Sequence, residues 1–119
     1  MATVNCVTDF TSEHKKYTWS GIATGDTVNE YVLGFQGYYN LTVSGTFAGG
    51  TTAKFLIGPE TGPTKSLSTD NSGAGTEWST TAETCTFLIG PIAAGTYAKP
   101  SVSSGSGDSV TFTISYAGE

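Results

Sequence analysis

The side chains with the greatest capacity for chemistry in this sequence are carboxylates, one histidine and a set of aromatic rings. Acid–base catalysis needs paired groups whose surroundings drive their pKa values apart. Most of the carboxylates stand in segments typical of turns, where such residues cap backbone groups, and no pair has a recognisable catalytic context. The carboxylates considered are Asp26, Glu60, Asp70, Glu77, Glu83 and Asp108. We therefore expect that this protein is not an enzyme and has no catalytic residues.

Metal binding and nucleophilic catalysis have few residues to draw on. His14 is the only histidine, and it stands between Glu13 and Lys15 in a charged run. A zinc site or a Ser-His-Asp relay is not predicted from one such histidine. Cys6 and Cys85 lack a CxxC spacing, so we favour two small buried thiols, with a disulfide between them as the alternative. No metal and no cofactor are expected.

Aromatic residues leave one binding hypothesis open. Rings exposed together on one face could stack on sugar rings, as in carbohydrate-binding modules of β-sandwich fold. Large aromatic side chains also dominate burial energetics, and we favour core or subunit-interface positions for them. The rings considered are Trp19, Trp78, Tyr38, Tyr39 and Tyr97.

The elements that would position these groups are strands. In residues 39–47, apolar side chains alternate with small polar ones, which is the period of a half-buried strand. Gly45 interrupts the apolar series, so we expect a bulge or a close backbone approach there. Residues 110–116 repeat the alternation. Two such strands predict a layered β domain.

The remaining pattern predicts eight or nine strands and no helix, in an antiparallel β-sandwich that is jelly-roll-like. We expect residues 52–57 to return from residues 39–47 as a hairpin. The run Phe-Leu-Ile-Gly-Pro occurs at residues 55–59 and again at 87–91, which suggests two strands with equivalent roles, such as paired edges. Residues 1–16 are expected to form an N-terminal arm or an edge strand. Residues 17–119 are expected to form a single domain.

Charge and composition limit the partners. The net charge is −5, there is no arginine, and the five lysines are dispersed, so neither nucleic acid nor an anionic membrane is expected as a partner. The sequence shows no run that predicts a membrane span and no signal-peptide pattern. Charged residues form only 13% of the chain, and threonine, serine and glycine fill the surface. A surface with few charges is cheap to desolvate, which suits permanent assembly.

Three segments carry a family resemblance. Residues 43–50 form a strand followed by a glycine turn, Trp78 follows a glycine-rich loop, and residues 95–103 precede the final alternating strand. In these features the chain, over about residues 17–119, resembles the small β-rich virion proteins of tailed bacteriophages, the capsid decoration (cement) or head-fibre class.

The resemblance implies a structural virion protein that binds the outer surface of a capsid and stabilises it through many distributed contacts. Its partners would be the major capsid protein and itself, as a homotrimer. It would be made in the host cytoplasm and located on the capsid surface of the virion, with a host-surface glycan as a further partner to consider. The alternative is a carbohydrate-binding β-sandwich module of the tail-fibre or receptor-binding type. The expected capsid or subunit contacts are Val4, Val7, Phe10, Trp19, Tyr39, Trp78, Tyr97 and Lys99.

Overall fold

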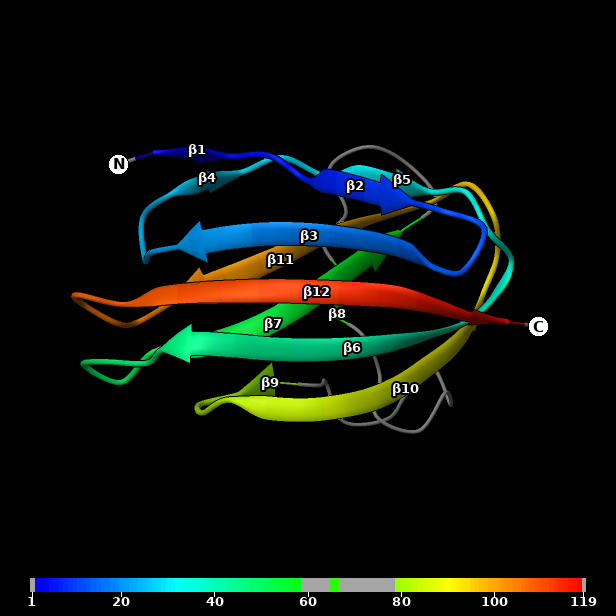
Figure 1. Cartoon of the computed structure of the whole chain (residues 1–119). Coiled ribbons are helices and arrows are strands. Elements are labelled where there is room, and N and C mark those ends of the chain that lie inside the picture. Colours follow the sequence, from blue (N-terminus) through cyan, green and yellow to red (C-terminus); the bar gives the residue numbers. More distant parts are fainter. Residues whose placement is uncertain (1, 59–64, 67–78, 119) are drawn as a thin grey trace.

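The computed structural model of the chain is an all-β structure (Figure 1). It describes the backbone of residues 2–58, 65–66 and 79–118, and the side chains of the same residues except 65–66, 84–87 and 90. The strands are β1 (Thr3–Val4), β2 (Val7–Phe10), β3 (Lys15–Ile22), β4 (Thr27–Val28), β5 (Tyr31–Leu33), β6 (Gly37–Thr46), β7 (Thr52–Gly58), β8 (Lys65–Ser66), β9 (Ser79–Thr80), β10 (Thr84–Ile92), β11 (Thr96–Ser103) and β12 (Ser109–Gly118). The predicted all-β class is confirmed.

Two antiparallel sheets face each other. The first sheet has the order β10-β6-β12-β3-β2, and the second has the order β5-β11-β7-β8, with β9 also pairing β7. Figure 1 shows the first sheet in front, with β7 and β11 crossing behind it. Successive long strands alternate between the two sheets: β6, β10 and β12 lie in the first, and β7 and β11 lie in the second. The short strands β8 and β9, which come between β7 and β10 in sequence, both pair with β7. A parallel pair, β1 and β4, lies outside both sheets.

The core fills the space between the sheets, as the alternation predicts. Apolar side chains of β3, β6 and β12 meet those of β5, β7 and β11. Phe55 of β7 lies between two first-sheet rings, with centroid distances of 6.1 Å to Trp19 and 6.2 Å to Phe112. The fully buried members on β6 and β12 are Tyr39, Leu41, Val43, Val110, Phe112 and Ile114. Their polar neighbours in sequence therefore face outward.

Gly45 is where two backbones approach closely, as expected from its place in the apolar series. Its φ is +116°, and a Cβ built on it would lie 2.1 Å from the carbonyl oxygen of Ser109 on β12. No side chain fits this space. Only glycine combines the positive φ with the close strand contact.

The predicted hairpin between residues 39–47 and 52–57 is wrong. The turn at residues 48–51 carries the chain from β6 in the first sheet to β7 in the second. Thr51 fixes it, because its hydroxyl oxygen accepts a hydrogen bond from the Ala48 amide (3.1 Å) and lies 2.7 Å from the Ala48 carbonyl oxygen. A tight glycine turn is compatible both with a hairpin and with a connection from one sheet to the other, so the local sequence did not distinguish them.

The two Phe-Leu-Ile-Gly-Pro runs are not equivalent edges. In the described residues, β7 has partners on both sides, whereas β10 pairs only with β6 and forms an edge of the first sheet. The repeat therefore reflects a shared apolar pattern rather than a shared position.

Residues 2–16 are attached to the sandwich by strand pairing and by hydrogen bonds. β2 pairs with β3 along its full length and forms the other edge of the first sheet. The Asn29 amide donates a hydrogen bond to the Val4 carbonyl (3.0 Å), and the Ala2 amide donates one to Asp26 (2.9 Å). The structure therefore has the edge strand that the sequence offered as the alternative to an arm.

A buried carboxylate ties three loops together at one end of the sandwich. Asp108 accepts hydrogen bonds from the Thr24 amide (2.9 Å) and hydroxyl (2.7 Å), and its Oδ2 lies 2.8 Å from the Thr51 hydroxyl. The bonds from Thr24 hold the pKa of Asp108 below its ordinary value. Bonds from the Ala23 and Ala2 amides likewise lower the pKa of Asp26. These two carboxylates cap backbone groups, as their turn context predicts.

Candidate functional site

The eight residues expected at contacts do not lie on one surface. Val7 and Phe10 stand on the edge strand β2 with 66% and 46% of their surfaces exposed, so both are available to a partner. Val4 is buried at 9% exposure and packs into the core. Of the three apolar residues expected at contacts in this segment, Val7 and Phe10 are therefore on the surface and Val4 is in the core.

Trp19 and Tyr39 are fully buried, which corrects their assignment to a contact surface. The Trp19 indole donates to the Asn29 carbonyl (3.0 Å), and the Tyr39 hydroxyl donates to the Phe35 carbonyl. Burial raises the pKa of the Tyr39 phenol. Both rings serve the core, one of the two positions favoured for the large aromatic residues from the sequence. Trp78 lies outside the described residues.

Tyr97 and Lys99 share the outer face of the second sheet. Each is half-buried and alternates with a buried neighbour along β11. Tyr97 stands opposite Val32 of β5, and Lys99 stands opposite Leu56 of β7. This face is on the opposite side of the sandwich from the outer face of the first sheet.

The outer face of the first sheet is covered by hydroxyl and amide side chains. The register places Thr113 of β12 between Thr42 of β6 and Thr18 of β3, so three threonines form a row across three strands. We name this surface the hydroxyl face, and its half-buried members are Thr18, Asn40, Thr42, Ser44, Thr111, Thr113 and Ser115.

A cation and an anion lie at the β2 margin of the hydroxyl face. Lys16 stands opposite Ser115 on one flank and opposite Asp9 of β2 on the other, so a cation and an anion are neighbours. Exposed apolar side chains stand at both edges, with Val7 opposite Thr18 and Leu88 of β10 opposite Asn40. A neutral centre with apolar and charged side chains at its margins resembles the anatomy of a protein interface.

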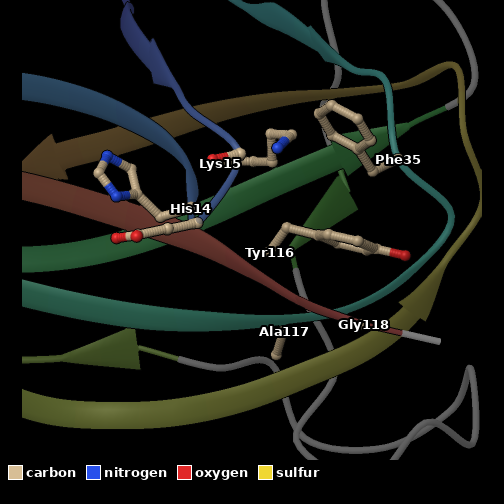
Figure 2. Close-up of a pocket in the computed structure, with 8 residues that line it drawn as sticks. His14, Lys15, Phe35, Tyr116, Ala117 and Gly118 are labelled. Carbon is tan, nitrogen blue, oxygen red and sulfur yellow. The ribbon is translucent and has the colours of Figure 1, made fainter.

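A groove of about 450 Å³ opens where the β2–β3 turn meets the end of β12 (Figure 2). Ala117 and Gly118 form one margin of it. Figure 2 shows the Lys15 and Phe35 side chains next to each other, with the Tyr116 ring across from them. We name this site the end groove, and its other lining residues are Ser12, Glu13, His14, Lys15, Phe35 and Tyr116.

The polar side chains of His14, Lys15 and Tyr116 in the end groove are held by neighbours. The His14 Nε2 lies 3.0 Å from the Asp9 carboxylate. The Lys15 ammonium donates to the Thr11 carbonyl and lies 5.9 Å from the centre of the Phe35 ring, within reach of a cation–π contact. The Tyr116 hydroxyl donates to the Gln36 carbonyl (2.7 Å). The groove therefore presents fixed rings and fixed polar groups to solvent.

Sequence reasoning missed the end groove. Glu13, His14 and Lys15 were considered only as a charged run, and Tyr116 only as an inward-facing strand residue. Phe35 was given no role. The alternation of residues 110–116 did indicate that Tyr116 points inward. Its contact with residues about 80 to 100 positions earlier in the chain depends on the fold and could not be predicted from that alternation.

Other kinds of site have little support in the described part of the chain. Among those residues, no group of three or more histidine, cysteine, aspartate and glutamate side chains could hold a metal ion. They also include no helix of the length and apolarity that crossing a membrane requires. The Cys6 thiol is free, and burial raises its pKa to about 11, while the side chain of Cys85 lies outside the description.

No family model matches this sequence, and no curated protein or solved structure matches it significantly.

Proposed function

We propose that this chain is a structural virion protein that binds the outer surface of a phage capsid and stabilises the shell without catalysing a reaction. The proposal rests on the resemblance of residues 43–50 and 95–103 to decoration proteins, and on one structural observation. That observation is the hydroxyl face, a broad outer surface whose centre carries no charged side chain.

A neutral hydroxyl surface is well suited to a permanent contact. Burying a charge requires an exact partner, whereas hydroxyls both donate and accept hydrogen bonds and so fit many arrangements of polar groups opposite them. The exposed Val7 and Leu88 at the edges would add apolar area. Each contact would be modest, and repeated copies linked in a homotrimer would raise the total affinity through avidity.

The partners in this proposal are the major capsid protein and two further copies of the chain. The protein would be made in the host cytoplasm and would end on the virion surface. Residues 7–10, which lie exposed on β2, remain available for the shell or a sister subunit, as does the outer face that carries Tyr97 and Lys99.

The experiment mixes the purified protein with undecorated capsids and images the particles. Regular density at repeated positions on the shell is expected for the wild-type protein. Thr113→Glu places a charge in the centre of the hydroxyl face and should weaken the affinity for the capsid at least tenfold. A tenfold loss of affinity corresponds to about 1.4 kcal/mol of binding free energy. Ser101→Glu, on the outer face of the second sheet, is the matched control and should bind normally.

Two results would count against the proposal in different ways. Capsids that stay bare with the wild-type protein would remove the shell-binding function. Binding that is lost in Ser101→Glu and kept in Thr113→Glu would instead move the contact to the face that carries Tyr97 and Lys99.

A further inference from the structure

We propose that the end groove binds one neutral sugar unit, either a free monosaccharide or the terminal residue of a glycan. This inference is independent of shell binding, because the groove and the hydroxyl face are separate surfaces. Lys15 lines the groove, whereas the adjacent Lys16 stands in the outward register with Ser115.

The dimensions and the rings of the groove fit a sugar. Its volume of about 450 Å³ is in the range of small-ligand sites. Phe35 and Tyr116 lie with their centroids 5.3 Å apart and their planes inclined by 30°. Phe10 contacts Phe35 edge to face at 5.5 Å, and the Tyr116 hydroxyl is bonded to Gln36, so both rings are fixed before a ligand arrives. Fixed aromatic surface is what the C–H groups of a pyranose ring would pack against, at little cost in entropy.

The polar groups of the groove match vicinal hydroxyls. Glu13 offers a carboxylate that accepts, and the Lys15 ammonium offers donors beyond the one used on the Thr11 carbonyl. Ser12 adds a hydroxyl that can do either. A sugar hydroxyl donates one hydrogen bond and accepts others, so it needs both kinds of partner close together. The end groove supplies both within four consecutive residues.

The balance of charge favours a neutral ligand. Glu13 and Lys15 both line the groove and carry opposite charges, and the Asp9 carboxylate bonded to His14 adds negative charge beside it. A phosphate or sulfate would lack the clustered cations that usually recognise it and would meet Glu13. A cation would have to compete with Lys15. An uncharged polyhydroxyl ligand is neither repelled by Glu13 nor in competition with Lys15.

The test follows the backbone amide signals by NMR during titration with the methyl glycosides of glucose, galactose, mannose and N-acetylglucosamine. At least one should give saturable shifts at Lys15, Phe35 and Tyr116, with a dissociation constant on the order of 1 mM, as expected for one sugar ring. A glycan array probed with labelled protein then distinguishes a terminal glycan residue, which binds more tightly when extended, from a free sugar, which does not.

Variants separate a binding site from a structural one. Glu13→Gln and Lys15→Ala should each weaken binding about tenfold, because glutamine replaces a charged acceptor with a weaker neutral one and alanine removes the ammonium donors. Lys16→Ala, which removes the same charge on the outward register, should leave the dissociation constant unchanged. The NMR spectrum of each variant shows whether it is folded. If Lys15→Ala disturbs the β2–β3 turn, the result for Glu13→Gln alone decides the test.

Three outcomes would overturn the inference. The first is that none of the four glycosides gives a saturable shift and the array is blank. The second is that shifts map to Tyr38 or Tyr97, which would place any sugar on an outer face. The third is equal loss of binding in Lys16→Ala and Lys15→Ala, since a general effect of positive charge would explain it.

Discussion

Replacing Gly45 by alanine tests the close packing of β6 against β12. The new Cβ would lie 2.1 Å from the Ser109 carbonyl oxygen, 3.1 Å from its carbon and 3.2 Å from the Val110 Cα. All three atoms are backbone, so no side chain can rotate away. Relief requires the two central strands of the first sheet to separate by about an ångström at this point, where ordinary contacts begin near 3.4 Å.

The magnitude has two parts. An alanine at φ +116° costs about 1–2 kcal/mol in backbone strain. Separating the strands weakens one or two ladder hydrogen bonds and the packing beneath them, at about 1 kcal/mol each. The expected loss is therefore about 3–5 kcal/mol, a large share of the 5–15 kcal/mol typical of a domain.

Denaturant unfolding of Gly45→Ala, followed by tryptophan fluorescence, measures this loss as a lower midpoint. Gly95→Ala is the control, because Gly95 has a similar φ of +91° but nothing within 4 Å of its added Cβ. It should lose only the strain, about 1–2 kcal/mol. Equal destabilisation of the two variants would refute the reasoning, since the strand contact would then contribute nothing.

Three further predictions follow from the same structure. Asp108→Asn should destabilise the protein at pH 7 by about 2–3 kcal/mol, because a charged acceptor of the Thr24 and Thr51 bonds is lost. The native pKa of Asp108 is depressed, so its contribution is present above its unfolded value and is lost as pH falls through the lower folded value. The stability difference between wild type and Asp108→Asn should therefore shrink in denaturation series as the pH falls below the ordinary range of an aspartate, and a difference independent of pH would contradict the assignment. Deleting residues 2–10 should lower the melting temperature, because it removes β2 and uncovers Tyr17, whereas a free arm would leave the melting temperature unchanged. Alkylation of Cys6 at pH 8 should be at least tenfold slower than that of a free cysteine, because burial raises its pKa to about 11, and reaction at the free rate would show that the thiol is not buried.

The sequence predicted which faces of the strands are buried, since period-2 alternation reports directly on the two sides of a sheet. Tyr39, Leu41 and Val43 face the core for this reason, and Gly45 marks the close approach of β12. The pairing of strands was harder to predict. The turn at residues 48–51 is compatible with a hairpin, and only the requirement to bury the apolar sides of both β6 and β7 selects the crossing.

Candidate sites were predicted less well than strands. Trp19 and Tyr39 were considered for contacts because large aromatics are common at interfaces, but the same property places them in the core. The end groove depends on residues 12–15, Phe35 and Tyr116, which only the closed sandwich brings together. No short-range pattern contains this information, because each of the three segments has an ordinary structural explanation by itself.

The edge strands of the first sheet are poorly suited to pairing with a strand of another molecule. Any assembly would therefore be expected to form through the outer faces of the sheets. An open edge offers unpaired backbone groups to another strand, and proteins commonly shorten or interrupt such edges. β2 is four residues long and carries Asp9, and the opposite edge strand β10 contains an exposed Pro91, which has no amide hydrogen to donate. Pairing through either edge is therefore short or interrupted. The hydroxyl face has no such restriction, and its half-buried threonines, serines and asparagine can form hydrogen bonds without removing any charge from water, so it is the surface on which a permanent contact costs least.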